Sequence, residues 1–302
     1  MDKKLLFVVG APRSGTTWVQ LLLAGGGDIA TVNETHLFSS WLTSLLGTWS
    51  GRGLHPRRIG ISELIERDEW VAHVRRLAEV ILTRIADRYP GAKIVMEKTP
   101  DHALWLRQIH DVFPDAYFLH IVRDPRSVVA SLRAASNDWG MHWAASGIIE
   151  NARLWRTFVW AVLDSQVPQD RILQIRYEDL KRDGADVLHK VFRWLDVATE
   201  WSECADIVER YQIANLQGGQ LPAAGWDLRS EPERFFRRGE TDSWRQELRP
   251  AEVATVEYVT GDLMETLGYL REQPRYRALR SIYAHKLLKV AQRQIEHWIR
   301  RV

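Results

Sequence analysis

The chain has 302 residues and a formal net charge of +2, with 45% hydrophobic and 26% charged residues. This length is enough for one complete α/β core, and the ordinary composition excludes disordered and fibrous classes of protein. The single cysteine, Cys204, excludes an intrachain disulfide and a metal site with several cysteine ligands.

The N-terminal stretch combines a buried strand, a glycine-containing loop and a helix start. The apolar run at 5–9 is typical of a strand covered on both faces, and Gly10 opens a loop. A helix is expected at about 17–24, ended by the glycines at 25–27 in a left-handed cap. Loop amides and the unpaired N–H groups of a helix N-terminus converge on anions. The stretch therefore predicts a phosphate site.

The spacing in this loop narrows the kind of phosphate. Gly10 and Gly15 stand where the glycines of the G-x-x-x-x-G-K-[ST] loop stand, and Thr17 takes the Ser/Thr place. Thr16 occupies the position of the lysine that reaches the β- and γ-phosphates, while Arg13 places a positive charge inside the loop. This favours a phosphate that carries a transferable anionic group over Mg-ATP.

The following elements alternate between strands and helices. Strands are expected near 29–32 and at 93–97, 116–122 and 172–176. Helices are expected at about 62–89, from after residue 102 to 113, and at 125–135, 142–164, 184–195, 202–211 and 250–267. The apolar face of the first is expected to carry Trp70, Val74, Leu77, Val80, Ile81 and Ile85. Residues 39–60 and 214–241 are expected to be irregular. The alternation predicts a single α/β domain, a central parallel sheet flanked by helices, with ligands at the carboxyl ends of the strands.

The C-terminal residues differ in charge from the rest of the chain. Residues 271–302 hold nine lysines and arginines against two glutamates, with apolar residues at helical spacing. We expect a domain at 1–270 and a basic helical extension at 271–302. The extension packs on the body, pairs in a homodimer or makes a peripheral contact with anionic lipid. No apolar run has the length of a membrane span or of a signal-peptide core, so we expect a cytoplasmic protein without a nucleic-acid partner.

The loop resembles that of a known enzyme family. Residues 12–18, Pro-Arg-Ser-Gly-Thr-Thr-Trp, are similar to the 5′-phosphosulfate loop of sulfotransferases that use 3′-phosphoadenosine 5′-phosphosulfate (PAPS). The resemblance implies a P-loop-like fold. It also implies donor contacts from the residues of this stretch, namely Arg13, Ser14, Gly15, Thr16, Thr17 and Trp18.

Three further stretches resemble the same family in the same order. Residues 122–131 are similar to its 3′-phosphate segment, which implies that Arg123 and Ser131 hold that phosphate. The alternative is a surface ion pair between Arg123 and Asp124. The run at 177–180 and Trp18 suggest adenine contacts by Tyr177 and Trp18, with core packing as the alternative for both rings. The block Arg237, Arg238, Gly239 with Trp244 resembles the family's basic cover over the 3′-phosphate, with solvated charge as its alternative.

Sulfuryl transfer needs a base for the acceptor proton and positive charge at the leaving oxygen. Arg13 and Thr17 fit the leaving-group side, with Lys98 as a second cation unless it merely pairs with Glu97. The base candidates are Glu34, His36 and His102, each just past a strand end. Glu34 leads, because glycan and tyrosyl sulfotransferases use a Glu in a similar stretch. His36 is base or orienter, and a purely structural role for His102 is the alternative to catalysis.

These resemblances imply transfer of a sulfuryl group from PAPS, with adenosine 3′,5′-bisphosphate as product and without a metal. The acceptor is a hydroxyl or amine of a small molecule, lipid or glycan, and the sequence does not select among these. Trp41 and Trp49 line an acceptor pocket or serve the core. The alternatives are a P-loop kinase or NTPase and a non-catalytic protein that binds nucleotide or membrane.

Overall fold

The computed structural model describes residues 2–49, 61–217, 235–237 and 239–274. These residues fall into two compact units, and each is described by itself. The first comprises Met1–Arg123 and Thr157–Gly239, and the second comprises Asp124–Arg156 and Glu240–Val302, both within the described residues. Arg238, most of the segment at 214–241 and the predicted helical extension from residue 275 on lie outside the described residues.

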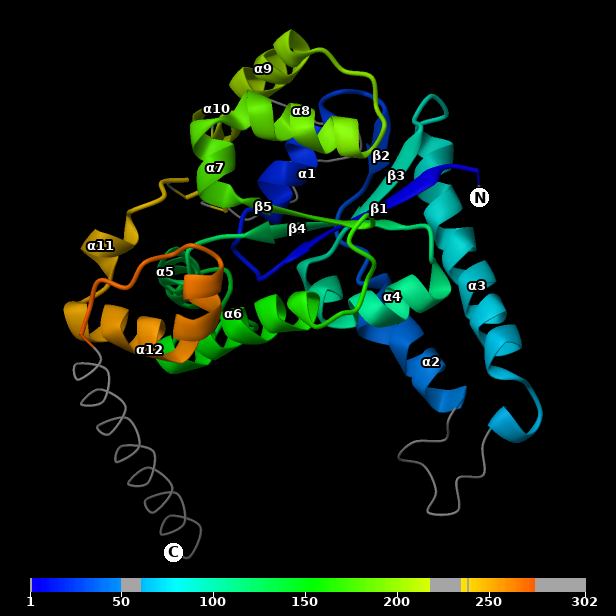
Figure 1. Ribbon diagram of the computed structural model, residues 1–302, viewed down its shortest axis with the longest axis horizontal. Coiled ribbons are helices and arrows are strands. Elements are labelled where there is room, and N and C mark those ends of the chain that lie inside the picture. Colours follow the sequence, from blue (N-terminus) through cyan, green and yellow to red (C-terminus); the bar gives the residue numbers. More distant parts are fainter. Residues whose placement is uncertain (1, 50–60, 218–234, 238, 275–302) are drawn as a thin grey trace, which may run out of the picture. The chain divides into compact units, whose positions relative to one another are not determined.

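Five parallel strands form the sheet of the first unit (Figure 1). They are β1 (Lys4–Gly10), β2 (Ile29–Thr31), β3 (Ile94–Lys98), β4 (Tyr117–Val122) and β5 (Ile172–Arg176). Their spatial order is β2-β3-β1-β4-β5, so the strand that leads into the glycine loop is central. The expected α/β class with a central parallel sheet is confirmed, and the carboxyl ends of all five strands lie at one edge.

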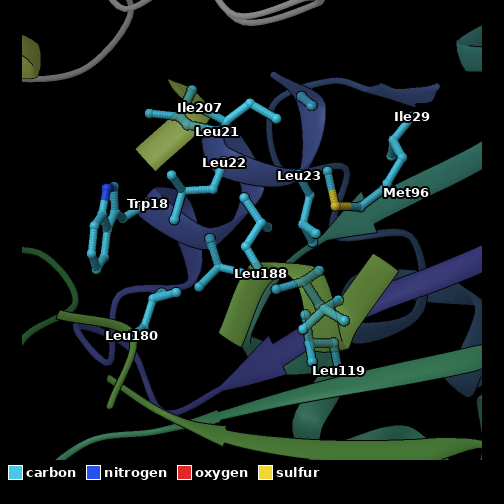
Figure 2. Close-up of a cluster of buried hydrophobic side chains, with 14 of the residues drawn as sticks. Trp18, Leu21, Leu22, Leu23, Ile29, Met96, Leu119, Leu180, Leu188 and Ile207 are labelled. Atoms are coloured by element: carbon cyan, nitrogen blue, oxygen red, sulfur yellow. The ribbon is translucent and has the colours of Figure 1, made fainter. Parts of the chain in front are cut away.

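One face of the sheet carries the main apolar cluster. Leu6 and Val8 of β1 and Leu119 of β4 pack there with leucines of the covering helices, as Figure 2 shows for Leu119 and its neighbours. The helices that cover this face are α1 (Thr16–Ala24), α7 (Tyr177–Arg182), α8 (Gly184–Trp194), α9 (Trp201–Arg210) and α10 (Ile213–Gln217). Cys204 is buried in the same cluster, which supports a packing role for this residue.

The opposite face carries an aromatic cluster. Phe7 stacks on Phe118 with ring centroids 5.7 Å apart, and it meets Phe38 and His102 edge-on at 6.0 Å each. Phe38 begins the π-helix η1 (Phe38–Leu42), and His102 lies in the 3-10 helix η3 (Pro100–Trp105), which leads into α4 (Leu106–Val112). These short helices hold the segments after β2 and β3 against the sheet.

Two expectations about the segments after β2 are wrong. Residues 39–49 are helical, since η1 continues into α2 (Thr43–Trp49), although serine, threonine and glycine have low helix propensity. Phe38 and Leu42 are fully buried there, so tertiary packing outweighs propensity. The helix after the short η2 (Ile61–Glu63) is α3 (Arg67–Arg88), which begins later than expected.

The buried face of α3 agrees with the expected one only in part. Val74 and Ile85 are buried as expected, together with Ala78 and Leu82, whereas Leu77 and Val80 are 39% and 61% exposed. Intervals of three and four residues keep the buried side chains on one stripe of the helix, and Val80 lies off that stripe.

The left-handed residue after α1 is the last of the three glycines expected to end this helix. Gly25, at the C-cap, is right-handed with φ of −63°, and the left-handed residue is Gly27, with φ of +82°.

The described residues of the second unit form helices joined by turns and loops. The helices are α5 (Pro125–Ser136), the first part of α6 (Ile148–Leu163), α11 (Trp244–Glu247) and α12 (Pro250–Thr266). The expected start of α6 at 142 is wrong, because the chain turns at 137–147 and the carbonyl of Gly147 accepts the first helical hydrogen bond, from Asn151 N–H at 3.1 Å.

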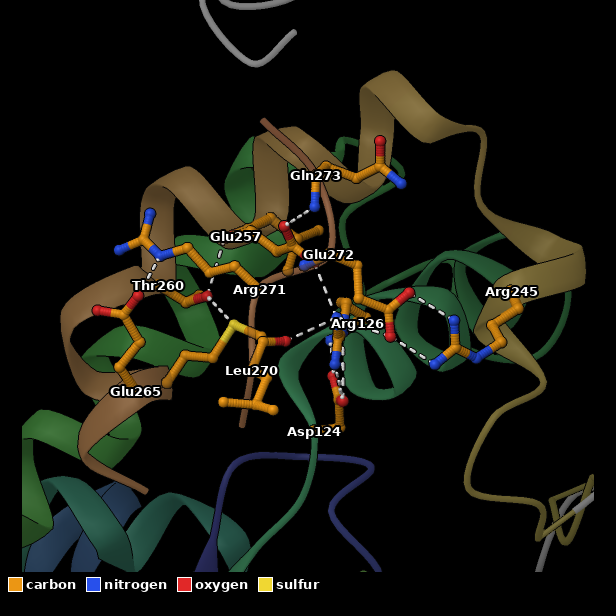
Figure 3. Close-up of polar contacts among 12 residues, drawn as sticks. Asp124, Arg126, Arg245, Glu257, Thr260, Glu265, Leu270, Arg271, Glu272 and Gln273 are labelled. Carbon is orange, nitrogen blue, oxygen red and sulfur yellow. Dashed lines mark hydrogen bonds and ion pairs between the residues drawn. The ribbon is translucent and has the colours of Figure 1, made fainter. Parts of the chain in front are cut away.

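A buried ion-pair network fixes the start of α5 within this unit (Figure 3). Asp124 caps α5 by accepting a hydrogen bond from Arg126 N–H at 2.8 Å. The Arg126 guanidinium contacts Asp124 at 2.6 Å and Glu257 of α12 at 2.8 Å. Glu257 also accepts hydrogen bonds from the backbone N–H groups of Glu272 at 3.0 Å and Gln273 at 2.9 Å. The network therefore joins α5, α12 and the chain after α12.

Candidate functional site

The loop between β1 and α1 has the backbone shape of an anion-binding loop. Arg13 and Gly15 are left-handed, with φ of 71° and 97°, a geometry that lets successive N–H groups turn inward. A Cβ on Gly15 would lie 2.6 Å from Cδ2 of Tyr177, so only glycine fits this position. The loop thus needs a glycine for two separate reasons.

The buried hydroxyl of Ser14 in this loop could donate a hydrogen bond to a ligand or accept one from it. Ser14 is 1% exposed, and within the described residues its Oγ has no hydrogen-bond partner. A buried hydroxyl without a partner is costly unless a ligand or water supplies one. Thr16 and Thr17 follow in the first turn of α1, whose N-terminal amides point the same way. The loop therefore fits a phosphate or sulfate group.

Lys98 connects this loop to the leading base candidate. Its Nζ donates to Thr17 Oγ1 at 3.2 Å and to Glu34 Oε1 at 2.5 Å, and its side chain is 0% exposed. The alternative pairing with Glu97 is wrong. Successive residues of a strand point to opposite faces, so Lys98 faces α1 while Glu97 faces η3.

Glu34 and His36 lie on the accessible side of Lys98. Glu34 Oε2 is 3.5 Å from His36 Nε2, and the two side chains are 31% and 46% exposed. Asp101 of η3 is a further carboxyl in this region, which the sequence analysis missed. Burial raises the pKa of Asp101, the nearby His36 ring opposes that shift, and the charge of Glu34 adds to it. Because the Glu34 side chain is partly exposed, an acceptor can reach it from solvent.

His102 is used inside the protein. It is 0% exposed, and its Nε2 accepts a hydrogen bond from Phe38 N–H at 3.1 Å. The ring proton is then on Nδ1, which lies 2.7 Å from Glu97 Oε2. With both nitrogens used in this way, His102 fits the structural alternative better than the role of base.

Tyr177 brings three of the predicted donor-binding stretches together. Its ring packs against Gly15, its hydroxyl donates to the carbonyl of Gly239 at 2.9 Å, and the Arg123 guanidinium carbon lies 4.2 Å from the ring centroid. Arg123 Nη1 also donates to the Arg13 carbonyl at 3.2 Å. The first unit therefore assembles the loop, the end of β4 and the basic block around one aromatic ring.

Trp18 and Tyr177 are buried, which supports the packing role predicted as the alternative for both rings. Trp18 is 4% exposed and Tyr177 is 2% exposed, and their centroids lie 5.6 Å apart. The Trp18 Nε1–H donates to the Tyr211 carbonyl at 2.8 Å. Adenine contacts by either ring stay a prediction.

Lys181 is a cation at this site that the sequence analysis missed. Its Nζ lies 5.3 Å from the Trp18 ring centroid. Burial lowers the pKa of Lys181, and the positive charge of Arg123 lowers it further. The position of Lys181 on α7, one turn after Tyr177, is the signal that could have revealed it.

Two of the other predicted residues, Ser131 and Trp244, belong to the second unit. Ser131 lies on α5 of the second unit and is 8% exposed, so its pairing with Arg123 stays a prediction. Arg13 Nη2 donates to the Phe235 carbonyl at 2.7 Å. Arg237 is half-buried, and Trp244 is packed in the second unit with the Arg126 guanidinium carbon 4.1 Å from its ring centroid.

Arg123 and Asp124, for which a surface ion pair is the predicted alternative, do not lie on the surface. Asp124 is 6% exposed, and its carboxylate contacts Arg126 at 2.6 Å. This stretch is therefore buried rather than solvated, and Asp124 serves as the cap of α5.

Comparison with known proteins decides the family. The model of the sulfotransferase family matches residues 6–203. The chain belongs to this family. It is 24% identical over 227 residues to a Drosophila melanogaster protein-tyrosine sulfotransferase, which covers 72% of the chain and 42% of that protein. The chain thus spans less than half the length of this protein and of other curated relatives that it matches.

Solved sulfotransferases share the fold. The sulfotransferase domain from the curacin biosynthetic pathway superposes with a TM-score of 0.59 at 19% identity, covering 90% of this chain and 99% of that one. The mouse sulfotransferase SULT7A1, solved in complex with PAP, has a TM-score of 0.56 at 16% identity and covers 87% and 85%. These values confirm the predicted fold.

Among the described residues there is neither a candidate membrane span nor a candidate metal site. None of their helices combines the length and apolar character needed to cross a bilayer. Nor do the described residues gather three or more His, Cys, Asp or Glu side chains in a form that could hold a metal ion.

Proposed function

We propose that this sulfotransferase-family protein transfers a sulfuryl group from PAPS to a hydroxyl or amine. One observation carries the proposal: the buried Lys98 Nζ contacts Thr17 in the loop and Glu34 at the same time, at 3.2 and 2.5 Å. A single cation therefore joins the site for the departing phosphate to the carboxylate that would take the acceptor proton. A nucleotide-binding protein without catalysis has no need of this link.

The residues of the loop suit the donor. The hydroxyl of Ser14 and the amides of α1 would hold the 5′-phosphosulfate, while Arg13 and Lys98 supply positive charge. Arg123 and Ser131 would hold the 3′-phosphate, with Arg237 and Arg238 over it. Tyr177 and Trp18 would border the adenine. Lys181 adds a cation beside Trp18. When bound, PAPS supplies the activated sulfuryl group, and the residues named here orient it.

The proposed step is an in-line displacement at sulfur. The acceptor oxygen or nitrogen forms a bond to sulfur while the bond from sulfur to the 5′-phosphate oxygen breaks, and adenosine 3′,5′-bisphosphate leaves. Glu34 accepts the acceptor proton, and His36, 3.5 Å away, orients the carboxylate or replaces it as base. Lys98 and Arg13 stabilise the charge that grows on the leaving oxygen.

The acceptor would meet Glu34 from the side of η1. Trp41 of η1 is 40% exposed, which supports contact with an apolar or sugar ring. We propose a hydroxyl of a small molecule, lipid or glycan. Because the Drosophila relative is named as a protein-tyrosine sulfotransferase, a tyrosine peptide belongs in the same test. The cytoplasmic location, the 1–270 and 271–302 division and the role of the extension stay predictions.

The test is transfer from 35S-labelled PAPS to a panel of phenols, aliphatic alcohols, sugars and tyrosine peptides. With the best acceptor, Glu34→Gln should lower turnover by roughly 10²- to 10⁴-fold, the usual effect of a general base, and leave the affinity for adenosine 3′,5′-bisphosphate unchanged. His36→Asn is the matched variant. If turnover is lost in His36→Asn but not in Glu34→Gln, the base is His36. Near-normal turnover in Glu34→Gln would remove Glu34 from the mechanism.

The kinase and the non-catalytic alternatives have their own outcomes. Stabilisation by Mg-ATP but not by adenosine 3′,5′-bisphosphate in a thermal-shift assay would favour a kinase or NTPase. Binding of the bisphosphate without transfer to any member of the panel, or to water, would favour the non-catalytic protein. The proposal expects stabilisation by the bisphosphate in the presence of EDTA.

A further inference from the structure

A buried carboxylate lies directly beneath the segment that carries Glu34 and His36. Glu97, at the end of β3, is 2% exposed. Its Oε1 accepts hydrogen bonds from the hydroxyls of Thr35 at 2.8 Å and Thr99 at 2.7 Å, and its Oε2 lies 2.7 Å from His102 Nδ1. Burial alone would raise the pKa of Glu97, but His102 and these hydroxyls lower it to about 2. The carboxylate is therefore ionised in the folded protein.

The network around Glu97 satisfies four successive backbone amides of the base segment. Each of these bonds has a donor–acceptor distance between 3.1 and 3.3 Å: Thr35 N–H to Glu97 Oε1, His36 N–H to Thr99 Oγ1, Leu37 N–H to Thr35 Oγ1 and Phe38 N–H to His102 Nε2. All four acceptors are Glu97 itself or side chains that contact it. An irregular segment outside the sheet thus gains fixed partners for every amide from 35 to 38.

The segment needs such support because its backbone is strained. His36 has a φ of 51°, a left-handed conformation that costs a non-glycine residue energy and persists only where surrounding contacts hold it. Glu97 and Lys98 are consecutive and point to opposite faces of β3, so the end of this strand contacts the segment through two side chains. Lys98 holds the Glu34 side chain, and the Glu97 network holds the backbone that follows Glu34.

We propose that Glu97 is a positioning residue, which sets the location of the Glu34 carboxylate through Thr35, Thr99 and His102. This rests on the proposed function, in which Glu34 is the base. Glu97 lies too deep to touch donor or acceptor, so its effect must pass through the segment. A misplacement of about 1 Å at a reacting group costs on the order of 100-fold in rate. Loss of the Glu97 charge should therefore affect turnover much more than nucleotide binding.

The experiment is a double-mutant cycle between Glu97→Gln and Glu34→Gln. Turnover is measured with 35S-labelled PAPS and the best acceptor of the panel, or transfer to water if none is found. Glu97→Gln alone should lower kcat by roughly 10- to 100-fold and keep the Kd of adenosine 3′,5′-bisphosphate within about twofold. In the Glu34→Gln background the same change should alter kcat by less than about twofold, because the group that it positions is already gone.

Two further measurements separate positioning from general stability. Amide hydrogen exchange at 35–38 should become faster in Glu97→Gln than in the wild type. The matched control is Glu252→Gln, which removes a carboxylate of α12 that pairs with Arg133 at 3.0 Å, and it should leave exchange at 35–38 and kcat unchanged. If Glu97→Gln fails to fold, Thr99→Val replaces it, with Thr99→Ser as the conservative variant that should restore kcat.

The outcomes distinguish the two proposals. Wild-type kcat and unchanged exchange at 35–38 in folded Glu97→Gln or Thr99→Val would overturn the positioning role. An equal loss of kcat in both Glu34 backgrounds would overturn it as well, because the effect would then not pass through Glu34. Near-normal turnover in Glu34→Gln alone would instead refute Glu34 as the base.

Discussion

His120 gives the protein a pH-dependent stability whose size follows from its burial. It lies on β4 between Val9 of β1 and Gln174 of β5 in the strand register, and it is 0% exposed. Burial lowers the pKa of His120 from 6.5 to about 4, against a small opposing effect of Gln174. Below pH 6.5 the unfolded chain binds a proton at this position, while the folded chain does not until the pH nears 4.

The sign and magnitude follow from that difference. A depressed pKa in the folded state adds stability above the unfolded value, and this stability is lost as the pH falls through the window from 6.5 to about 4. Within this window each pH unit lowers the free energy of unfolding by about 1.4 kcal/mol. Across the whole window His120 therefore accounts for a loss of about 3 kcal/mol. We expect His120→Leu, which cannot titrate, to lack this part of the loss.

The assay is urea unfolding of wild type and variant at pH 7 and pH 4.5. The free energy of unfolding should fall by about 2 to 3 kcal/mol more in the wild type than in His120→Leu between these values. His73→Leu, at a position on α3 that is 49% exposed, is the control and should follow the wild type. An equal decrease in wild type and His120→Leu would show that the burial of His120 carries no proton linkage.

Two other substitutions test particular contacts. Gly15→Ala should lower the free energy of unfolding by about 2 to 5 kcal/mol, because the new Cβ would lie 2.6 Å from Tyr177. It should also lower the affinity for adenosine 3′,5′-bisphosphate at least tenfold. Gly27 is left-handed too but has open space around it, so Gly27→Ala should cost only about 1 to 2 kcal/mol. Calorimetric binding with equal affinities in the two variants would contradict this. Arg126→Met removes the guanidinium that contacts two buried carboxylates and should cost about 3 to 5 kcal/mol in urea unfolding. The half-exposed Arg245→Met should cost less than about 1 kcal/mol. Similar losses in both would refute the role of the buried network.

The sequence by itself was sufficient for the elements whose signals are local. The run at 5–9, the two glycines of the loop and the helix after it predicted β1, the anion loop and α1 close to their observed bounds. Alternation of strands and helices was enough for the parallel sheet, because strands joined by crossovers of this length pair in parallel. These features depend on residues that are near one another in the sequence, so they can be predicted from the sequence alone.

Tertiary structure decided which charged residues meet. Lys98 pairs with Glu34, 64 residues away, instead of the adjacent Glu97, because the pleat of β3 points the neighbours to opposite faces. His102 loses its role as a base candidate only because Phe38 of η1 donates to its ring. The helix at 43–49 likewise forms against the propensity of its residues, since burial of Phe38 and Leu42 stabilises the preceding turn. Contacts of this kind depend on strand register and packing between distant segments, which no local pattern in the sequence records.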